Sequence, residues 1–325
     1  MRYIQIGKSD IRASVVALGT WAIGGGSWWG TNDDQESIRT IQSAIDQGIN
    51  LVDTAPVYGF GHSEEVVGKA IKDRRDKVHI STKCGIWWND QEGSYYFTRD
   101  GHDTYKNLSK RAVKQGLEDS LRRLGTDYVD ILFTHWQSVE PFFTPVEETM
   151  EALNELKKEG KILAIGASNV SPQHIEAYTA CGQLDIIQEK YSILDRRIEA
   201  ELLPCAKAHG ITFQAYSPLE QGILTGKIQR DYVPEEGSAR YGKKWYSPEY
   251  LPLAIDMVNS WQSLCEKYHC TPTHLAIAWI AAQGESMNVL CGARKIQQLE
   301  DNIGGAEITL TKEECEWMRE QAQFK

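Results

Sequence analysis

Short apolar runs recur along the chain, and most of them are followed by a loop and then by an amphipathic stretch. Residues 34–47 illustrate the helical period, because Ile38, Ile41 and Ile45 fall on one face and Gly48 follows as a C-terminal cap. By these criteria helices are predicted at 34–47, 63–72, 110–124, 145–159, 172–180, 199–209, 248–268 and 272–282, with a last one starting near Thr311. The apolar runs predict strands at 15–18, 50–53, 78–83, 128–134, 162–167, 186–188, 212–215 and 288–291.

Two segments fall outside this alternation. Ile4 and Ile6 precede a turn at 7–10, and residues 11–16 resume the extended pattern, which predicts a β-hairpin at the N-terminus. Residues 84–108 show no helical period and are predicted to form a long loop.

The eight predicted strands alternate with helices, which indicates a parallel sheet covered by helices. No linker and no shift in composition divides the chain, so residues 1–325 are predicted to form one domain. An open doubly wound sheet and a closed barrel both fit the alternation, and eight units in one domain favour the barrel. The predicted fold is therefore an α/β (β/α)8 TIM barrel, with the N-terminal β-hairpin as a plug at its lower end and a C-terminal helix.

The composition narrows the classes of function. The net charge of −10 argues against non-specific binding to nucleic acid or to an anionic membrane. The seven cysteines include no Cys-x-x-Cys pair, which argues against a disulfide framework or a structural zinc site. The chain has no signal-peptide core and no apolar run near the roughly 18 residues of a membrane span. We therefore expect a cytoplasmic protein with reduced thiols, while its oligomeric state stays open.

In a parallel barrel the active site lies at the carboxyl ends of the strands. Polar side chains occur at or just beyond several of the predicted strand ends. They are Asp53, Tyr58, Lys83, His135, Ser168, Asn169, Gln188, Tyr216 and Ser217. Because they come from different strands, only closure of the sheet would bring them together.

The first four of these side chains form a coherent set for reducing a carbonyl group. A carbonyl that accepts hydride needs a proton donor close by. We hypothesise that Tyr58 donates the proton and that the Lys83 ammonium lowers the pKa of its phenol. Asp53 would hold Lys83 in its charged form, and His135 would orient the carbonyl oxygen. The alternatives are an ordinary buried ion pair between Asp53 and Lys83, and an ordinary core histidine at position 135.

Glycine and tryptophan are frequent in the predicted loops that follow the strands. The glycines at 24–26 lack the G-x-G-x-x-G context of a Rossmann phosphate loop and are predicted to form a flexible loop at the barrel mouth. Aromatic side chains in such loops would make an apolar pocket. The predicted substrate contacts are Trp21, Tyr58, Trp87, His135 and Trp136.

The same residues carry a resemblance to the aldo-keto reductase family. Residues 18–21 (Leu-Gly-Thr-Trp) and 50–59, with Ser63-Glu64 beyond them, resemble its first two strand signatures. Residues 81–83 (Ser-Thr-Lys) and 128–135, which end in Thr-His, resemble the segments that supply its lysine and its histidine. The match runs in order over about residues 1–310. It is closest to the bacterial branch that acts on methylglyoxal-like carbonyls, although the substrate does not follow from this.

The resemblance implies a barrel that reduces an aldehyde or ketone to an alcohol with a nicotinamide cofactor. Residues 166–169 and Gln188 resemble the residues that hold the carboxamide of the nicotinamide. Residues 216–227 resemble the tyrosine that stacks on the nicotinamide and the loop that covers the pyrophosphate, and residues 292–302 resemble the segment that holds the adenosine end of the cofactor. The implied cofactor-binding residues are Gly19, Thr20, Trp21, Asp53, Ser168, Asn169, Gln188, Tyr216, Ser217, Pro218, Leu219, Gln221, Gly222, Leu224, Thr225, Gly226, Lys227, Gly292, Arg294, Gln298, Asp301 and Asn302.

Two departures from the family pattern affect specificity. The segment His135-Trp136-Gln137-Ser138 replaces a commoner pattern after the histidine, which puts the wall of the substrate pocket in doubt. Some relatives carry a lysine for the 2′-phosphate where this chain has Gly292, and here Arg294 is the candidate for that role. Because arginine recognises phosphate with a planar fork, NADPH is preferred to NADH.

Two other functions stay in view, and a third is rejected. An alcohol or sugar dehydrogenase would run the same chemistry in the oxidative direction. Some members of the family serve as cofactor-sensing subunits of membrane channels, and turnover of a generic aldehyde would separate an enzyme from such a sensor. A metal-dependent hydrolase is rejected because only His135 and Asp53 qualify as ligands at the strand ends, so no metal is expected. The expected partner is a small carbonyl compound, with neither nucleic acid nor membrane.

Overall fold

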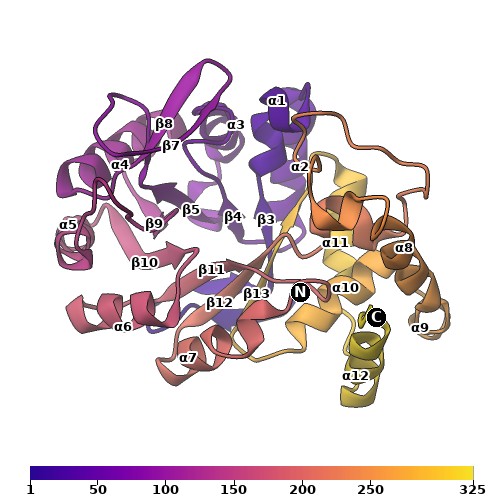
Figure 1. Cartoon of the computed structure of the whole chain (residues 1–325). Helices are drawn as coiled ribbons and strands as arrows, with labels where there is room; N and C mark the ends of the chain where they lie inside the picture. The colour runs from indigo at the N-terminus through magenta and orange to yellow at the C-terminus, as the bar shows by residue number, and fades with distance from the viewer. Residues whose placement is uncertain (325) are drawn as a thin grey trace.

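The computed structural model describes residues 1–324, and in this part of the chain eight parallel strands close into a barrel. Each strand pairs with the next along the chain, and the last pairs with the first. The strands are β3 (Val16–Gly19), β4 (Leu51–Asp53), β5 (His79–Cys84), β9 (Val129–Thr134), β10 (Ile162–Ser168), β11 (Ile186–Lys190), β12 (Thr212–Tyr216) and β13 (Met287–Gly292). The predicted (β/α)8 barrel is therefore confirmed (Figure 1). That residues 1–325 form one domain stays a prediction, and Lys325 lies outside the described residues.

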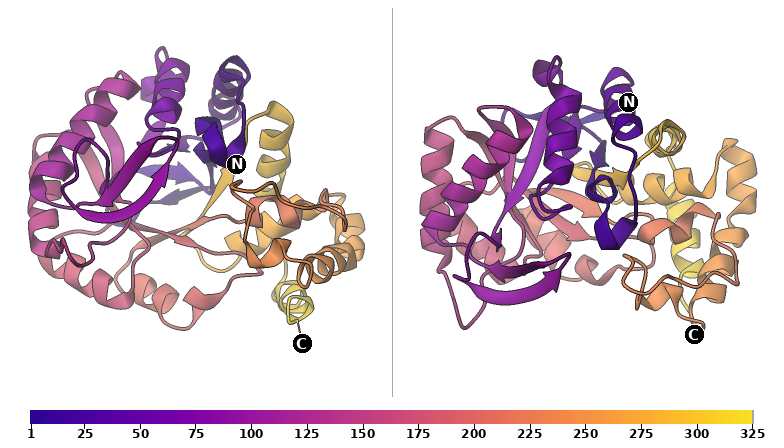
Figure 2. Two further views of the ribbon diagram at one scale, coloured as in Figure 1. Left: turned by 45° about the horizontal axis from the view of Figure 1, so that its top comes forward. Right: turned by 90° about the horizontal axis from the view of Figure 1, so that it is seen from above.

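Helices surround the barrel strands, as both views of Figure 2 show. The helices that follow the eight strands are α2 (Asp34–Asp46), α3 (His62–Ile71), α4 (Lys110–Leu124), α5 (Val146–Lys158), α6 (Pro172–Cys181), α7 (Leu202–Ala208), α10 (Pro272–Ala281) and α11 (Ile296–Gly305). The others are α1 (Gly26–Trp29), α8 (Leu251–Ser260), α9 (Gln262–Tyr268) and α12 (Lys312–Gln321), with 3-10 turns η1 (Trp21–Gly24), η2 (Arg75–Lys77), η3 (Arg197–Glu199), η4 (Glu220–Thr225) and η5 (Lys244–Tyr246). Within residues 1–324, every helix is too short or too polar to cross a membrane.

Local capping explains where several helices begin and end. Ser109 Oγ accepts the N–H of Ala112 at the start of α4, and Gly125 ends this helix with a left-handed φ of 65°. Thr311 and Glu314 form a reciprocal capping box at the start of α12. The predicted cap at residue 109 and the predicted C-terminal helix are thereby confirmed.

The N-terminal hairpin is confirmed and closes the lower end of the barrel. Strands β1 (Tyr3–Gln5) and β2 (Arg12–Ser14) pair in antiparallel fashion. Ile6 and Ile11 from this hairpin are buried in one apolar cluster with Phe133 and other side chains of the barrel strands. The plug therefore completes the core at the end where the barrel strands begin.

The prediction of a long loop at 84–108 is wrong. Within it, β6 (Ile86–Trp87), β7 (Ser94–Arg99) and β8 (His102–Lys106) form a three-stranded antiparallel sheet. Positive φ angles at Asp100 (48°) and Gly101 (80°) make the tight turn between β7 and β8. An Asp-Gly pair between two strand-like runs is a recognised hairpin signal, but the half-exposed strands on either side of it lack a continuous apolar run.

Two helix predictions also need correction. The single helix expected at 248–268 is broken into α8 and α9 at Trp261, whose side chain is fully buried. The helix α11 was not predicted, because the segment around Arg294 was read only for its resemblance to a nucleotide-binding stretch. Its apolar residues at 296, 299 and 303 have the helical spacing that could have revealed it.

We expect Ile6→Ala to lower the free energy of unfolding by about 2–5 kcal/mol, because Ile6 is fully buried in the plug and its truncation leaves a cavity. Urea denaturation followed by tryptophan fluorescence measures this change. Lys8→Ala, at an exposed position of the same hairpin, serves as the control and should leave stability nearly unchanged. Equal stability of the two variants would contradict the role of the hairpin as a plug.

Candidate active site

The carboxyl ends of the strands bring the four predicted catalytic side chains together. Asp53 ends β4, Lys83 lies next to the end of β5, and His135 directly follows β9. Tyr58 lies in the turn between β4 and α3. The centroid of its ring is 4.9 Å from Lys83 Nζ and 6.0 Å from the centroid of the His135 ring. Closure of the barrel therefore makes one site from residues that span more than 80 positions.

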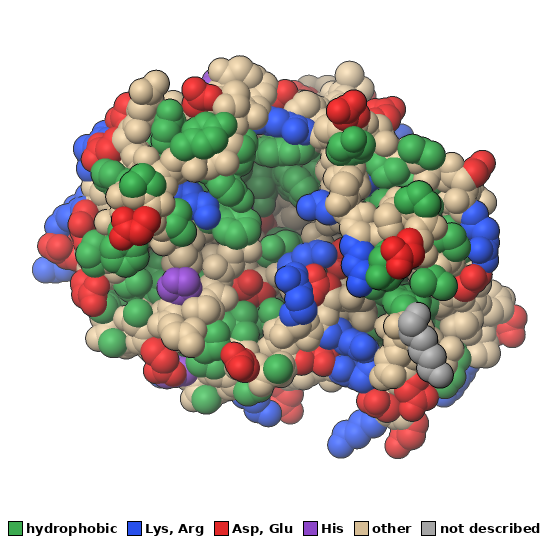
Figure 3. Space-filling view, in the orientation of Figure 1, with side chains coloured by type: hydrophobic (Ala, Val, Ile, Leu, Met, Phe, Trp, Pro, Cys, Tyr) green, Lys and Arg blue, Asp and Glu red, His purple; other side chains and the backbone are tan. Residues whose placement is uncertain are grey.

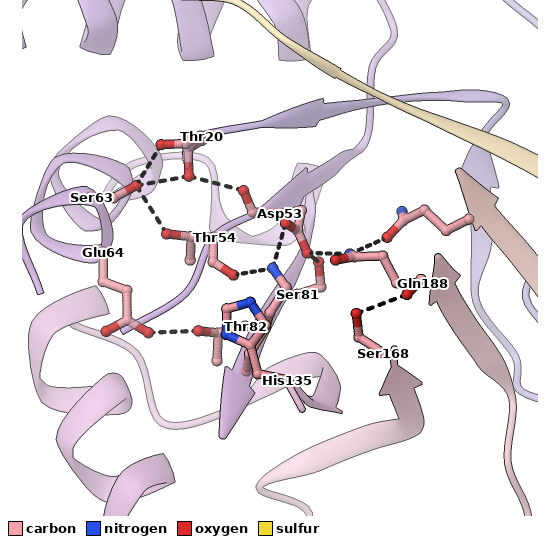
Figure 4. A network of polar contacts seen from close by, with 12 residues as sticks. Thr20, Asp53, Thr54, Ser63, Glu64, Ser81, Thr82, His135, Ser168 and Gln188 are labelled. Atoms are coloured by element: carbon pink, nitrogen blue, oxygen red, sulfur yellow. Dashed lines mark hydrogen bonds and ion pairs between the residues drawn. The ribbon is translucent and has the colours of Figure 1, made fainter. Parts of the chain in front are cut away.

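A buried ion pair lies at the base of this site (Figure 4). Lys83 Nζ is 2.6 Å from Asp53 Oδ2, and the two side chains are 0% and 1% exposed. The same ammonium group donates to the carbonyl oxygen of Thr54 at 2.8 Å. Because both charges are out of water, neither group can lose its partner without a large penalty.

The other oxygen of the carboxylate is held from two sides. Asp53 Oδ1 accepts from Ser81 Oγ at 2.8 Å and from Gln188 Nε2 at 3.0 Å. Gln188 also donates to Gln214 Oε1, and Gln214 Nε2 in turn donates to Asn288 Oδ1 at 2.7 Å. Polar side chains from β4, β5, β11, β12 and β13 thus cross the inside of the barrel and fix the orientation of the carboxylate.

Close backbone contact positions Tyr58. A Cβ at Gly24 would lie 2.6 Å from the carbonyl carbon of Tyr58, and one at Gly59 would lie 2.2 Å from the carbonyl oxygen of Gly24. Glycine is therefore required at both places for the loop after β3 to pack on the turn that carries Tyr58. The glycines at 24–26 connect η1 to α1 in this packed segment, rather than forming the open loop that the sequence suggested.

Burial dominates the protonation of the site. It raises the pKa of Tyr58 well above its ordinary value, with a further contribution from the negative charge of Asp53. Burial lowers the pKa of Lys83 against the opposing effect of Asp53, and it lowers the pKa of His135 well below its ordinary value, helped by the charge of Lys83. Tyr58 and His135 are therefore neutral near pH 7. The predicted lowering of the phenol pKa is corrected for the free protein, because burial and the negative charge of Asp53 both raise it.

A second buried carboxylate supports the site from below and was not predicted as a site residue. Glu64, fully buried on α3, accepts from Thr82 Oγ1 and from Arg123 Nε, both at 2.6 Å. Ser63 beside it donates to Thr20 Oγ1 at 2.8 Å. These bonds tie α3 and α4 to β3 and β5, next to the ends that carry Asp53 and Lys83. The only sequence signal was the Ser-Glu pair of the family resemblance.

The predicted cofactor-binding residues lie at the ends of several barrel strands and in the loops that follow. They are Gly19, Thr20 and Trp21 at β3, Asp53 at β4, Ser168 and Asn169 at β10, Gln188 at β11, Tyr216, Ser217, Pro218, Leu219, Gln221, Gly222, Leu224, Thr225, Gly226 and Lys227 at and beyond β12, and Gly292, Arg294, Gln298, Asp301 and Asn302 at and beyond β13. They occupy the same end of the barrel as Tyr58.

Asn169 links three strand ends in this region. It adopts a left-handed backbone conformation with φ of 57°. Its Nδ2 donates to the carbonyl oxygen of His135 at 2.8 Å, and its Oδ1 accepts from the hydroxyl of Tyr216 at 2.9 Å. Ser168 Oγ donates to the carbonyl oxygen of Gln188 at 2.8 Å. The ring of Tyr216 is thereby linked through Asn169 to His135, one of the four predicted catalytic residues.

The loop after β12 has an unusual backbone. Ser217, Gln221 and Gly222 all have positive φ angles, between 53° and 107°. The carbonyl oxygen of Gln221 accepts from Arg240 Nε and from the hydroxyl of Tyr246, both at 2.9 Å. Arg240 thus ties its segment to the loop after β12, while residues 241–244 are exposed.

Arg294 ties the loop after β13 to the loop after β3. Its Nη1 donates to the carbonyl oxygens of Trp29 and Thr31, each at 3.2 Å. Its backbone N–H donates to Gln298 Oε1 at 2.9 Å. In this structure the guanidinium group therefore serves partly as a backbone clamp, in addition to carrying a charge at the rim of the site.

The far end of the site is held by a second cluster of polar contacts. Lys227 Nζ lies 3.0 Å from Asp301 Oδ2, and Thr271 Oγ1 donates to Asp301 Oδ1 at 2.8 Å. Asn302 Nδ2 donates to the carbonyl oxygen of Gly292 at 3.2 Å. These contacts connect the loop after β12 with α11, so the two segments predicted to hold the cofactor face one another.

Aromatic side chains gather above Tyr58. Trp21 lies 6.4 Å from Tyr58 and 5.2 Å from Trp29, measured between ring centroids. The sequence analysis did not predict that the segment 84–108 supplies side chains to this group. The aromatic cluster consists of Ala55, Val57 and Ile86 packed with Trp28, Tyr58, Phe60, Trp88, Tyr96, Phe97 and Trp136.

Trp87 does not join the aromatic cluster, and its role as a substrate contact stays a prediction. Its Nε1 donates to Asp90 Oδ1 at 2.6 Å, and its ring lies 5.2 Å from the guanidinium carbon of Arg111. Side chains alternate along a strand, so Ile86 faces the aromatic cluster and Trp87 faces the other way. Trp21 lies near Tyr58 and Trp136 belongs to the aromatic cluster, and their role as substrate contacts stays a prediction.

Among the described residues, one group has the spacing of metal ligands. Glu176, Cys205 and His209 place ligand atoms within 4.8 Å of one another. They lie on α6 and at α7, outside the barrel and apart from the strand ends that carry Tyr58. The expectation that the active site uses no metal stays a prediction.

The chain is similar to known reductases over nearly its whole length. A family model described as the aldo/keto reductase family matches residues 15–322. The NADH-specific methylglyoxal reductase of Escherichia coli (strain K12) is 51% identical over 325 residues, which cover 99% of each chain. An aldo-keto reductase of Bacillus subtilis (strain 168) is 40% identical over 304 residues, covering 92% of this chain and 87% of its own. Among solved structures, the glycerol dehydrogenase of Gluconobacter oxydans has a TM-score of 0.88 at 34% identity, and the match covers 98% and 94% of the two chains.

We expect Asp53→Asn to lower the free energy of unfolding by about 3–5 kcal/mol, because the change keeps the side-chain shape and leaves a buried ammonium group without its counter-charge. Urea denaturation measures the loss. The double variant Asp53→Asn with Lys83→Met removes both charges and should recover a large part of it. A double variant less stable than Asp53→Asn would show that the stability of this region does not depend on the ion pair.

Proposed function

This chain belongs to the aldo/keto reductase family, and on that premise we propose that it reduces an aldehyde or ketone to an alcohol with Tyr58 as the proton donor. The family and its named relatives make the protein a nicotinamide-dependent oxidoreductase. The observation that supports the role of Tyr58 most directly is its ring, placed over the Lys83 ammonium and next to the ring of His135.

The residues at the strand ends fit a nicotinamide cofactor. The ring of Tyr216, fixed by Asn169, offers a flat apolar surface beside the site, and the amides of Asn169 and Gln188 provide donors and acceptors. A Cβ at Gly292 would meet only one atom within 4 Å, at 3.8 Å, so the end of β13 is open. When bound there, the reduced nicotinamide supplies the hydride.

Neutral donors orient the carbonyl and complete its reduction. His135 is uncharged because burial and Lys83 lower its pKa, so a ring N–H can donate to the carbonyl oxygen without releasing a proton to it. Tyr58 stays protonated because its pKa is raised, and its hydroxyl passes a proton to the oxygen as negative charge develops there. The alkoxide that forms is a far stronger base than a phenolate, so this transfer is favourable even from a weakly acidic phenol.

Lys83 and Asp53 act on Tyr58 through charge and position. The Lys83 ammonium lies 4.9 Å from the centre of the phenol ring and is available to stabilise a phenolate after the proton has left. Asp53 keeps this ammonium charged in a site where burial favours its neutral form. The aromatic cluster above Tyr58 excludes water, which strengthens each of these electrostatic effects.

We further propose that the preferred cofactor is NADPH. Arg294 carries a positive charge just beyond the end of β13, in the segment whose Asp301 contacts Lys227 of the loop after β12, and a guanidinium fork suits a 2′-phosphate. NADH is the second candidate, because Arg294 Nη1 already binds two backbone carbonyl oxygens and the 51% identical relative is named as NADH-specific. Oxidation of an alcohol by the same residues stays open, since one structural neighbour is named as a glycerol dehydrogenase.

Tyr58→Phe removes one hydroxyl group and keeps the ring. We expect kcat for a generic aldehyde to fall by about 10²–10⁴-fold, because the general acid is lost. Cofactor affinity, measured by quenching of tryptophan fluorescence, should change little. Tyr95→Phe is the matched control, since Tyr95 is 60% exposed and outside the aromatic cluster, and it should keep wild-type kcat. Full activity of the Tyr58 variant would exclude the proposed acid.

Arg294→Ala tests the cofactor. We expect the KM for NADPH to rise by about 10–100-fold and the KM for NADH to change much less, because a charge-assisted bond to a phosphate is lost. Steady-state kinetics with both cofactors provide the measurement, and Lys158→Ala removes an exposed charge on α5 as the control. If both KM values rise equally, Arg294 acts only as a clamp on the loop after β3, and NADPH is not selected by it.

A further inference from the structure

Two cationic side chains lie on the aromatic cluster that covers Tyr58. Lys106, the last residue of β8, places its Nζ 4.7 Å from the ring centroid of Tyr96 and 4.9 Å from that of Trp136. Trp136 directly follows His135 along the chain. The ammonium group therefore contacts the residue that follows the side chain proposed to hold the carbonyl oxygen. Figure 3 shows a hollow in this face that is lined mainly by hydrophobic side chains, with Lys and Arg at its edge.

Lys106 has a charge that the protein leaves uncompensated. Within residues 1–324, no carboxylate lies within 4.0 Å of its Nζ. Lys110, four residues later, shows the ordinary behaviour of a surface lysine here, with Glu151 at 2.8 Å and Glu155 at 2.5 Å. Partial burial lowers the pKa of Lys106, which means that its ammonium group has lost some of its water without gaining an anion. An anion brought to this place would replace that lost solvation.

Arg99 is a second cation on the neighbouring strand β7, where it pairs with His102 at the turn end of the hairpin, while Lys106 pairs with Ser94 at the other end. Its guanidinium carbon lies 5.1 Å from the ring centroid of Trp28, and one Nη donates to the carbonyl oxygen of Gly237 in the loop after β12. Its Nε is buried and has no hydrogen-bond partner among the described residues. A buried N–H without an acceptor is unfavourable in a free protein, and a ligand oxygen can supply that acceptor.

From these observations we propose that the carbonyl substrate carries an anionic group, a carboxylate or a phosphate, which binds Lys106 with Arg99 as a second cation at the pocket rim. This inference rests on the proposed function, because it assigns the substrate class to the same site. The carbonyl end of the molecule lies between Tyr58 and His135, and its anionic end points toward the three-stranded sheet.

The surroundings of Lys106 favour recognition of an anion over a purely structural role. The aromatic faces of Tyr96 and Trp136 hold the ammonium by cation–π attraction and form an apolar wall on either side of it. A charge-assisted hydrogen bond formed against such a wall is stronger than one made in open water. The apolar members of the aromatic cluster contact the carbon chain of the substrate, while the cation selects its charged end.

The test compares matched pairs of substrates. Succinic semialdehyde carries a carboxylate at its far end where its methyl ester carries a neutral ester group, and glyceraldehyde 3-phosphate and glyceraldehyde differ in the phosphate. We expect kcat/KM to be higher for the anionic member of at least one pair, and Lys106→Met to lower that value by about 10–100-fold. The neutral partner should stay within about threefold of wild type. Whichever pair responds identifies the anion as a carboxylate or a phosphate.

Controls separate this inference from the function on which it rests. Lys106→Arg keeps the charge and should restore most of the preference, while Lys158→Met removes an exposed charge elsewhere and should change neither member of a pair. Equal effects of Lys106→Met on charged and neutral substrates, or a wild-type preference for the neutral ones, would overturn the inference and leave carbonyl reduction intact. Failure of the wild type to reduce any of the four compounds would overturn the proposed function and this inference with it.

Discussion

An ammonium group and a carboxylate lie together inside the barrel, where Lys83 Nζ is 2.6 Å from Asp53 Oδ2 and neither side chain has contact with solvent. Removing each of these ions from water costs several kcal/mol, and their mutual attraction offsets this only where further hydrogen bonds complete the geometry. Those bonds come from Ser81 on β5 and Gln188 on β11, two residues more than 100 positions apart along the chain. The geometry of the ion pair therefore depends on the register of the whole closed sheet.

The same burial that makes the ion pair costly to form also determines the protonation of Tyr58 and His135 beside it. In a site so poor in water, the pKa of Tyr58 rises and that of His135 falls, so both are neutral hydrogen-bond donors near pH 7. Lys83 is then the positive charge available to a phenolate or an alkoxide as it forms. The aromatic cluster keeps this arrangement dry, and the uncompensated cations Lys106 and Arg99 add a place for charge at its rim.

The barrel and the placement of the four catalytic candidates could be predicted from the sequence, because apolar strands, helix caps such as Ser109 and polar residues at strand ends are local signals. The three-stranded sheet at 86–106 was missed, since its half-exposed strands lack a continuous apolar run and only the Asp100-Gly101 turn marks them. Contacts between distant segments, such as Arg123 with Glu64, leave no local trace. The protonation of Tyr58 was misjudged because desolvation depends on packing that no spacing reveals.

We propose that the Lys83 ammonium, held by Asp53, supports proton donation by Tyr58 to the reduced carbonyl. The single-turnover rate of cofactor oxidation by a generic aldehyde in Lys83→Met measures this support, with cofactor binding checked by tryptophan fluorescence to show that the barrel is folded. We expect a rate lower by about 10²-fold or more with cofactor affinity little changed. A wild-type rate in the folded variant would contradict it.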